Sequence, residues 1–259
     1  MCNFYGHKVS RMENIKLKQI IKQLGTAEAL QELQRMRNGF EYVNAPILRK
    51  SAPNDVEVLS AHWEFIPSWI TNVNQLQAAR KQGIPWLNAR SETMLASNMF
   101  KDAVLNRRCL VPASHFFEWR AYTPPGVKKE IKYPYAIELS EADYFYMAGI
   151  YNSYINPQTG IALISFAIVT TAANALMQEV HNQKKRMPTI LPDELAWRWV
   201  MDDLSEEAIK AIATYQLPAA SMKAYTIAKN FKAADDPLTP FHYEGLPPLA
   251  ITESGREMK

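Results

Sequence analysis

The fold class is decided by three consecutive runs, YPYAIEL (residues 133–139), YFYMAGIY (144–151) and ISFAIVT (164–170). Each run is rich in β-branched and aromatic residues, the composition typical of β-strands. The NPQTG segment (156–160) between the last two runs predicts a tight turn that joins two strands. Strands connected in this way predict a largely antiparallel sheet.

Outward from these runs, shorter strands and separate helices are predicted along the chain. Strands are expected at 42–43, 56–59, 63–66 and 109–111, with a hairpin loop at 121–132. One or two helices are expected within 13–37, and others at 172–180, 193–202 and 205–214. Because strands and helices do not alternate strictly, we expect an α+β fold, with one domain at 1–235 and a partly flexible tail at 236–259.

The composition is that of a globular protein. The 259 residues are 47% hydrophobic and 21% charged, which suits one ordinary domain or at most two. No apolar run approaches the roughly 20 residues that a membrane helix needs, and the N-terminus lacks the apolar stretch of a secretory signal. We therefore expect a cytoplasmic protein with no membrane partner. The net charge of +3 permits phosphate binding without requiring it.

Cysteine usage draws attention to the second residue. Cys2 and Cys109 are too few for a disulfide framework, and five scattered histidines with no Cys-x-x-Cys pair predict no metal and no cofactor. Removal of Met1 leaves Cys2 with an α-amine of pKa about 7.7–8.0 beside its thiol. Such a pair attacks an aldehyde and closes to a thiazolidine. From position alone, an incidental small residue is the commoner explanation.

The NARSET segment (88–93) is expected where a strand enters a loop. Arg90 offers a planar guanidinium that suits a phosphate, and Asn88 offers a hydrogen-bond donor and an acceptor. The segment alone also fits a surface ion pair between Arg90 and Glu92.

In the FFEW segment (116–119), a carboxylate lies between aromatic residues. Desolvation there raises the pKa of Glu118 and suits it to acid–base work, while Trp119 can stack on an unpaired base. The other explanation is a strand whose aromatics face the core while Glu118 points outward.

A basic loop contains His181, followed by Lys184, Lys185 and Arg186. Nearby cations disfavour the protonated imidazole, which leaves His181 available as a base, and the same cations suit a phosphate track. A solvated basic loop with a chance histidine is the commoner alternative.

In their order, these segments resemble the SOS response-associated peptidase (SRAP) family, whose members shield abasic sites in single-stranded DNA. The resemblance extends from residue 2 to about residue 230. It rests on Cys2 and on the following segments in order: WEFIPSW (63–69), NARSET (88–93), RCLVP (108–112), FEW (117–119), AGIY (148–151), TTAAN (170–174), and His181 with RMP (186–188).

The resemblance implies a single domain built around a curved, barrel-like, mainly antiparallel sheet flanked by helices. It implies a monomer that bonds an abasic site in single-stranded DNA to Cys2 as a thiazolidine, in the response to DNA damage. It also implies self-processing of the N-terminus by peptide hydrolysis, a lyase-like activity, and reversal of the crosslink.

The resemblance also assigns roles to individual residues. Cys2 is the nucleophile and Glu118 the acid or base. Asn88 orients the N-terminal residue, and His181 helps to open the sugar ring. DNA contacts are assigned to the following residues: Arg90, Trp63, Trp119, Thr171 and Arg186.

Two positions depart from the family pattern. The family usually begins Met-Cys-Gly-Arg, and that arginine helps to hold a DNA phosphate, whereas this chain has Phe4 at that position. His7 and Lys8 are the candidates to replace the contact. Loss of one phosphate contact lowers the slope of log K for DNA binding against log salt concentration by roughly one unit. Residues 183–185 (QKK) also lengthen the loop before Arg186 and add two lysines.

Two other functions stay open. Cys2 and His181 are a conceivable pair for a thiol peptidase that acts on other proteins. A non-catalytic module for single-stranded nucleic acid would instead use Trp63, Trp69, Trp119 and the basic loop.

Overall fold

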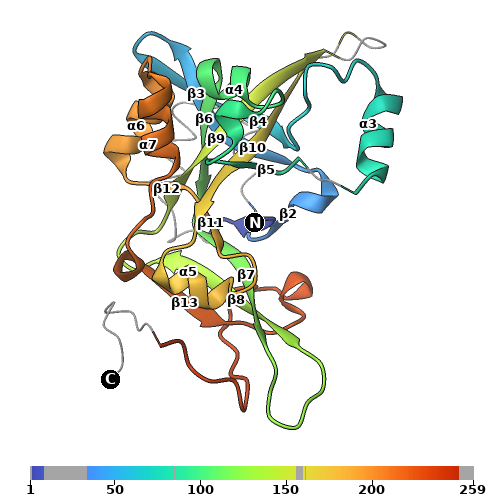
Figure 1. Ribbon diagram of the computed structural model, residues 1–259, viewed down its shortest axis with the longest axis vertical. Coiled ribbons are helices and arrows are strands. Elements are labelled where there is room, and N and C mark those ends of the chain that lie inside the picture. Colours follow the sequence, from blue (N-terminus) through green and yellow to red (C-terminus); the bar gives the residue numbers. More distant parts are fainter. Residues whose placement is uncertain (1, 9–33, 84–85, 156–159, 161, 251–259) are drawn as a thin grey trace.

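Two β-sheets pack against each other, and helices cover the outer side of the larger sheet (Figure 1). The computed structural model describes residues 2–8, 34–83, 86–155, 160 and 162–250. Most of the range 13–37, in which helices are predicted, and most of the turn predicted at 156–160 lie outside the described residues. The end of the first range is wrong, because residues 34–36 are not helical and Arg37 begins a strand.

The larger sheet closes into a five-stranded barrel. Neighbouring strands pair around the ring in the order β10–β4–β3–β6–β9, and β9 pairs back to β10. Within this ring of five strands, β4 and β10 form the one parallel pair, which confirms the expected α+β fold with a barrel-like, mainly antiparallel sheet. The five strands are β3 (Asn44–Ala52), β4 (Asp55–Trp63), β6 (Arg108–Ala113), β9 (Phe145–Ile155) and β10 (Ala162–Ala172).

Three short strands extend the barrel sheet. They are β5 (Asn88–Arg90), β11 (Arg186–Pro188) and β12 (Ile190–Leu191). β5 runs parallel to β10, whereas β11 pairs antiparallel with the end of β10. The NARSET segment therefore does begin in a strand and continue into a loop, as predicted.

The barrel strands are buried on both faces, which explains their nearly continuous apolar runs. In β6, Cys109 and Val111 face the core that lies toward the second sheet, whereas Leu110 faces the cluster that contains Trp199. Side chains of a strand alternate between its two faces, so a run such as ISFAIVT supplies two separate cores at once.

The second sheet is antiparallel throughout and carries the N-terminus. Its order is β13–β8–β7–β1–β2. Tyr5 pairs with Phe116 and Gly6 with His115. A side chain at Gly6 would collide with the Arg35 carbonyl and the His115 ring, so glycine allows β1 to lie this close. The strands are β1 (Phe4–Gly6), β2 (Arg37–Asn38), β7 (His115–Tyr122), β8 (Ile131–Leu139) and β13 (Met222–Thr226).

Helices pack on the outside of both sheets, with α6 and α7 on one side of the barrel and α3 on the other (Figure 1). Side-chain caps mark the starts of α5 and α7: Asn174 accepts from Met177 N, and Ser205 accepts from Ala208 N. The helices are α3 (Val73–Lys81), α4 (Lys101–Asn106), α5 (Ala175–Val180), α6 (Asp193–Met201) and α7 (Glu206–Ala213). No helix among the described residues is long and apolar enough to cross a membrane.

The strand expected at 42–43 is wrong. Tyr42 has a left-handed φ of 53° and ends the 3-10 helix η1 (Gly39–Glu41), so β3 begins only at Asn44. The other 3-10 helices are η2 (Met94–Ala96), η3 (Ala219–Ser221) and η4 (Phe231–Ala233).

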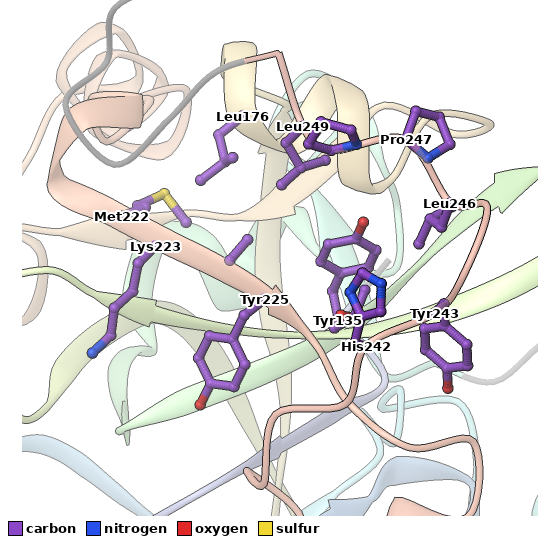
Figure 2. A pocket seen from close by; sticks show the side chains of 13 residues that line it. Tyr135, Leu176, Met222, Lys223, Tyr225, His242, Tyr243, Leu246, Pro247 and Leu249 are labelled. Atoms are coloured by element: carbon purple, nitrogen blue, oxygen red, sulfur yellow. The ribbon is translucent and has the colours of Figure 1, made fainter.

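The C-terminal segment 236–250 lies along the second sheet. Arg120 donates to the Pro247 carbonyl at 2.6 Å, and Ala250 N donates to Glu179 Oε2 at 2.8 Å. A groove of about 440 Å³ separates this segment from β8, β13 and α5. Figure 2 shows side chains from both sides of the groove, including Tyr135, Met222 and Leu249.

Candidate functional site

A carboxylate and an imidazole face each other between β7 and the end of α5. Glu118 is buried in β7, with only 3% of its surface exposed, and His181 directly follows α5 and is buried as well. Glu118 Oε2 lies 3.6 Å from His181 Nε2. The alternative in which Glu118 points outward from its strand is therefore wrong, because β7 is covered on both faces at this position.

Asn182 fixes the position of His181, a role that no pattern in the sequence indicates. Its side-chain oxygen accepts from Ala121 N at 3.0 Å, and its nitrogen donates to Ala121 O at 2.8 Å. These two bonds attach the loop after α5 to β7, three residues beyond Glu118. An asparagine in a basic loop has no distinctive pattern, so only the tertiary structure identifies it.

His181 is neutral and has a defined tautomer. Burial is the largest cause that lowers its pKa, to about 4, and the nearby Lys184 and Arg186 charges act in the same direction. Burial therefore lowers the pKa of His181 more than do the nearby cations, on which the argument from sequence rested. Nδ1 lies 2.8 Å from the Arg186 carbonyl, which can only accept, so Nδ1 carries the proton. The Nε2 lone pair then points at Glu118.

Glu118 titrates near neutral pH. Burial raises its pKa to about 7, because the charged carboxylate loses hydration inside the protein. A carboxyl group that is half protonated at physiological pH can both donate and accept protons. Together with the neutral His181, it forms a pair that can hold one exchangeable proton.

Cys2 lies next to this pair. Its side chain is fully buried, and the sulfur is 3.9 Å from the Phe4 carbonyl. Burial raises the pKa of the Cys2 thiol, and the Glu118 charge raises it further, so the two groups are within electrostatic reach. The β1–β7 pairing accounts for this, because its register continued toward the N-terminus runs past Glu118.

Asn88 holds the residue that follows Cys2. Its Nδ2 donates to Asn3 Oδ1 at 3.0 Å from the short strand β5, so the barrel sheet contributes to the same site. Among the described residues, Asn88 Oδ1 has no hydrogen-bond partner although it is buried. This oxygen is an acceptor available to a group that enters the site.

The residues predicted to contact DNA differ in accessibility. Arg90 is exposed, and Trp119 is partly exposed. Arg186 bonds to Glu92 Oε1 at 2.5 Å and to the backbone carbonyl of Thr170, which leaves 13% of its side chain exposed. Glu92 therefore pairs with Arg186, and the surface pair with Arg90 considered from the sequence does not form.

Trp63 and Thr171 belong to the core, which corrects their assignment as DNA contacts in this conformation. Trp63 is completely buried, and its indole donates to the Leu87 carbonyl at 3.1 Å. Thr171 is 2% exposed, and its hydroxyl donates to the Thr214 carbonyl at 3.3 Å. A base cannot reach either side chain without opening the core.

His7 and Lys8, considered as replacements for the missing cation at position 4, are engaged elsewhere. His7 is fully buried, and burial lowers its pKa to about 3, so it is neutral at physiological pH. The Lys8 ammonium forms an ion pair with Glu138 at 2.7 Å. Neither side chain presents a positive charge to a phosphate beside Phe4.

The site lies apart from the groove of Figure 2, which none of Cys2, Asn88, Glu118 and His181 lines. In the part of the chain that the structure describes, no group of three or more His, Cys, Asp or Glu side chains is arranged to hold a metal ion. The four side chains are thus brought together by β1, β5, β7 and the end of α5, at the seam between the two sheets.

Known proteins have related sequences. Abasic site processing protein YoqW of Bacillus subtilis (strain 168) is 30% identical over 166 residues, which cover 64% of this chain and 67% of that protein. Abasic site processing protein HMCES of Xenopus tropicalis is 28% identical over 178 residues, which cover 61% of this chain and 51% of that protein.

The fold has a solved counterpart of the same size. A protein from Bacteroides thetaiotaomicron superposes with a TM-score of 0.76 at 28% sequence identity, covering 92% of this chain and 97% of that one. The family model described as SOS response associated peptidase (SRAP) matches residues 1–234. Because that match covers far more than half of the sequence, the chain belongs to the SOS response associated peptidase (SRAP) family.

Proposed function

We propose that this protein binds abasic sites in single-stranded DNA and bonds them covalently to Cys2 after Met1 has been removed. The observation that carries the proposal is the convergence of Cys2 with a carboxyl group of pKa about 7 and a neutral imidazole, 3.6 Å apart. Relatives named abasic site processing proteins support the same class of substrate.

The first step opens the deoxyribose ring. His181 Nε2 accepts the proton of the C1′ hydroxyl, the bond from C1′ to the ring oxygen breaks, and Glu118 donates its proton to that oxygen. The product is an aldehyde at C1′. A neutral histidine and a protonated carboxyl group are the forms this step needs, and both are populated at pH 7.

The next steps form the crosslink. The Cys2 amine adds to the aldehyde carbon, His181 returns its proton to the carbonyl oxygen, and the nitrogen passes one proton to the Glu118 carboxylate. The hydroxyl of this adduct then leaves as water with that proton, and the nitrogen gives its second proton to Glu118, which leaves an imine. The Cys2 sulfur then adds to the imine carbon while the thiol proton passes to the nitrogen. Aldehyde and aminothiol thus become a thiazolidine and one water molecule, and the same groups in reverse order release the DNA.

Glu118 also suits the removal of residues that precede Cys2. A carboxylate beside the first peptide bond can activate water for its hydrolysis, which supplies the free amine. Measurement of the intact mass of the purified protein tests this step, because loss of Met1 is expected. Permanent retention of Met1 would contradict the proposal.

A matched pair of cysteine variants tests the crosslink. Cys2→Ala should form no adduct with an oligonucleotide that contains one abasic site, as judged on a denaturing gel. Cys109→Ala is the control, because this second buried cysteine lies within the barrel core. Adduct formation by Cys2→Ala at the parent rate would refute the proposal.

A thiol peptidase that acts on other proteins fits the geometry less well. Such an enzyme needs a reactive thiolate, whereas burial and the Glu118 charge raise the pKa of Cys2. Turnover of peptides in the absence of DNA would favour that function instead.

A further inference from the structure

Three aromatic side chains pack together in one cluster, called the aromatic platform: Phe4, Phe40 and Trp119. The centroid of the Phe4 ring lies 5.2 Å from that of Trp119 and 6.1 Å from that of Phe40. Phe4 is 5% exposed, whereas Phe40 is 47% exposed and Trp119 is partly exposed. Two accessible rings therefore rest on one buried ring.

A lysine adds a positive charge to the aromatic platform. The Lys232 ammonium lies 4.0 Å from the Phe4 centroid and 5.8 Å from the Trp119 centroid. Attraction between the cation and the rings holds this charge in place. Lys232 is exposed, and no ion pair between it and another described residue is present. Its N–H groups are thus available to an anion.

Two strands connect the aromatic platform to the reactive groups. Phe4 is two residues from Cys2, and Trp119 directly follows Glu118. Trp119 and Glu118 point to opposite faces of β7, so a DNA strand bonded at Cys2 reaches these rings by passing around the edge of the second sheet, with a neighbouring nucleotide a few ångströms farther along.

Phe40 is held in its exposed position by defined contacts. Its backbone N–H donates to Asn38 Oδ1 at 3.1 Å at the start of η1. Tyr42 ends η1, and the Arg80 guanidinium lies 4.0 Å from the centroid of the Tyr42 ring. These contacts fix the backbone of η1, while the accessible Phe40 and Trp119 rings both pack against Phe4, and exposed apolar groups that gather in one patch mark an interaction site.

We infer that the aromatic platform and Lys232 bind the nucleotide next to the lesion, with a base stacked on Phe40 or Trp119 and its phosphate on Lys232. Flat π-faces beside a fixed cation match the two chemical features of single-stranded DNA. The inference rests on the proposed function for the identity of the strand, and it adds Phe40 and Lys232 to the residues that the sequence singled out.

Binding of a lesion-free single-stranded oligonucleotide, followed by fluorescence anisotropy over a range of salt concentrations, tests this inference. Phe40→Ala should weaken binding at least about fivefold, as expected for one lost stacking contact. Lys232→Ala should lower the slope of log K against log salt by about 0.7, the value for one phosphate contact with a single strand. Lys232→Arg should retain the slope.

The control is Lys229→Ala, which removes the same charge three residues away. The Lys229 ammonium lies over Tyr133 and Tyr243, at 5.5 and 6.0 Å from their centroids, and so contacts other rings than those of the aromatic platform. Its loss should leave the salt slope near that of the parent. Equal slopes for Lys229→Ala and Lys232→Ala, with no effect of Phe40→Ala, would overturn the inference.

Crosslinking is measured separately with an abasic oligonucleotide, so that the two proposals can fail independently. If the parent protein forms no adduct while Phe40→Ala and Lys232→Ala still weaken strand binding, the crosslinking function fails and the binding surface stands. A duplex of the same length provides a further check, because its bases are already stacked on one another. An equal loss of duplex binding in Phe40→Ala would overturn the stacking role.

Discussion

Glu64 and Glu118 are both almost completely buried, yet their surroundings make them chemically different. Glu64, which directly follows β4, is 1% exposed and receives hydrogen bonds from Arg80 at 2.5–3.1 Å, with His62 at 3.3 Å. Although burial acts in the opposite direction, these bonds hold the pKa of Glu64 below its ordinary value. Glu118, 3% exposed, faces a neutral imidazole, and burial raises its pKa to about 7.

The difference shows that burial alone does not create an acid–base group. A guanidinium beside a carboxylate cancels the loss of hydration and fixes the charged form, which makes the pair structural. A neutral imidazole leaves the cost of the charge largely in place, so the proton can leave or return near pH 7. The side chain that faces each glutamate decides between the two outcomes. It is Arg80 of α3 for Glu64, and His181, which follows α5, for Glu118.

The largest effect expected from this contrast is kinetic. Glu118→Gln should slow adduct formation by about 100-fold or more, since a positioned acid–base group contributes that much. Glu64→Gln should leave the rate within about twofold, because this group holds no exchangeable proton at pH 7. Single-turnover crosslinking on denaturing gels measures both rates. A similar loss in the two variants would remove the distinction.

Binding to an intact strand is the control for Glu118→Gln. The substitution keeps the shape of the side chain, so binding without chemistry should stay near the parent value. If binding falls as much as adduct formation, Glu118 supports the structure instead of the reaction.

The second expected effect concerns the free energy of unfolding, for which the order of the two glutamates is reversed. Glu64→Gln should lower the free energy of unfolding by about 2 kcal/mol, because it leaves the Arg80 guanidinium partly buried without its charged partner. Glu118→Gln should be neutral or stabilising at pH 8, where the parent buries a charge. Urea denaturation followed by circular dichroism measures both. Greater destabilisation by Glu118→Gln would contradict the assignment.

The third effect is a pH profile. Below a pH of about 7 Glu118 is protonated and can act as an acid, whereas the terminal amine must be neutral and has an ordinary pKa of about 7.7–8.0. The rate of adduct formation should therefore peak between about pH 7 and 8 and fall up to tenfold per unit on either side. In Glu118→Gln the decrease in rate at alkaline pH should disappear. If the decrease persists, a group other than Glu118 causes it.

The same pKa values determine whether the free energy of unfolding rises or falls with pH. The folded state binds the Glu118 proton more tightly than the unfolded state, so between pH 4.5 and about 7 this group makes stability fall as pH rises. For His181, whose pKa is lowered to about 4, the unfolded state binds more protons, and stability rises with pH between about 4 and 6.5. Glu118→Gln should thus steepen the rise of stability with pH in that window.

Local patterns in the sequence predicted much of the fold. The runs at 133–139, 144–151 and 164–170 correspond to β8, β9 and β10, and the helices expected at 193–202 and 205–214 correspond to α6 and α7. Residues within these elements are selected by burial and capping, which act over a few positions and are visible in a single sequence. Closure of the barrel depends on pairing between strands far apart in the chain, β4 and β10, and came only from the resemblance.

The site was predictable as a set of residues but not as a set of contacts. Nothing local distinguishes Trp63, which lies in the core, from the partly exposed Trp119. The partner of a buried carboxylate also comes from elsewhere in the chain: Arg80 is sixteen residues from Glu64, and His181 is much farther from Glu118. The positive charge that lies over the Phe4 ring belongs to Lys232, which is more than 200 residues away in the sequence.

The smallest effect concerns the residue that holds the imidazole in place. Asn182→Ala removes two hydrogen bonds to the Ala121 backbone, each worth about 1 kcal/mol, so the His181 loop should separate partly from β7. Water that enters beside Glu118 should lower its pKa toward the ordinary value. We expect adduct formation about fivefold slower at pH 7.5, because a bond of about 1 kcal/mol corresponds to that factor.

The alkaline decrease of the pH profile should also move to lower pH in Asn182→Ala. Asn182→Asp retains the acceptor for Ala121 N and loses the donor to Ala121 O, so its effect should be intermediate. A slower rate with an unshifted profile would mean that Asn182 acts on binding or folding. A shifted profile at an unchanged salt slope would show instead that the neighbour of a buried carboxylate must be held in place to keep its proton exchangeable.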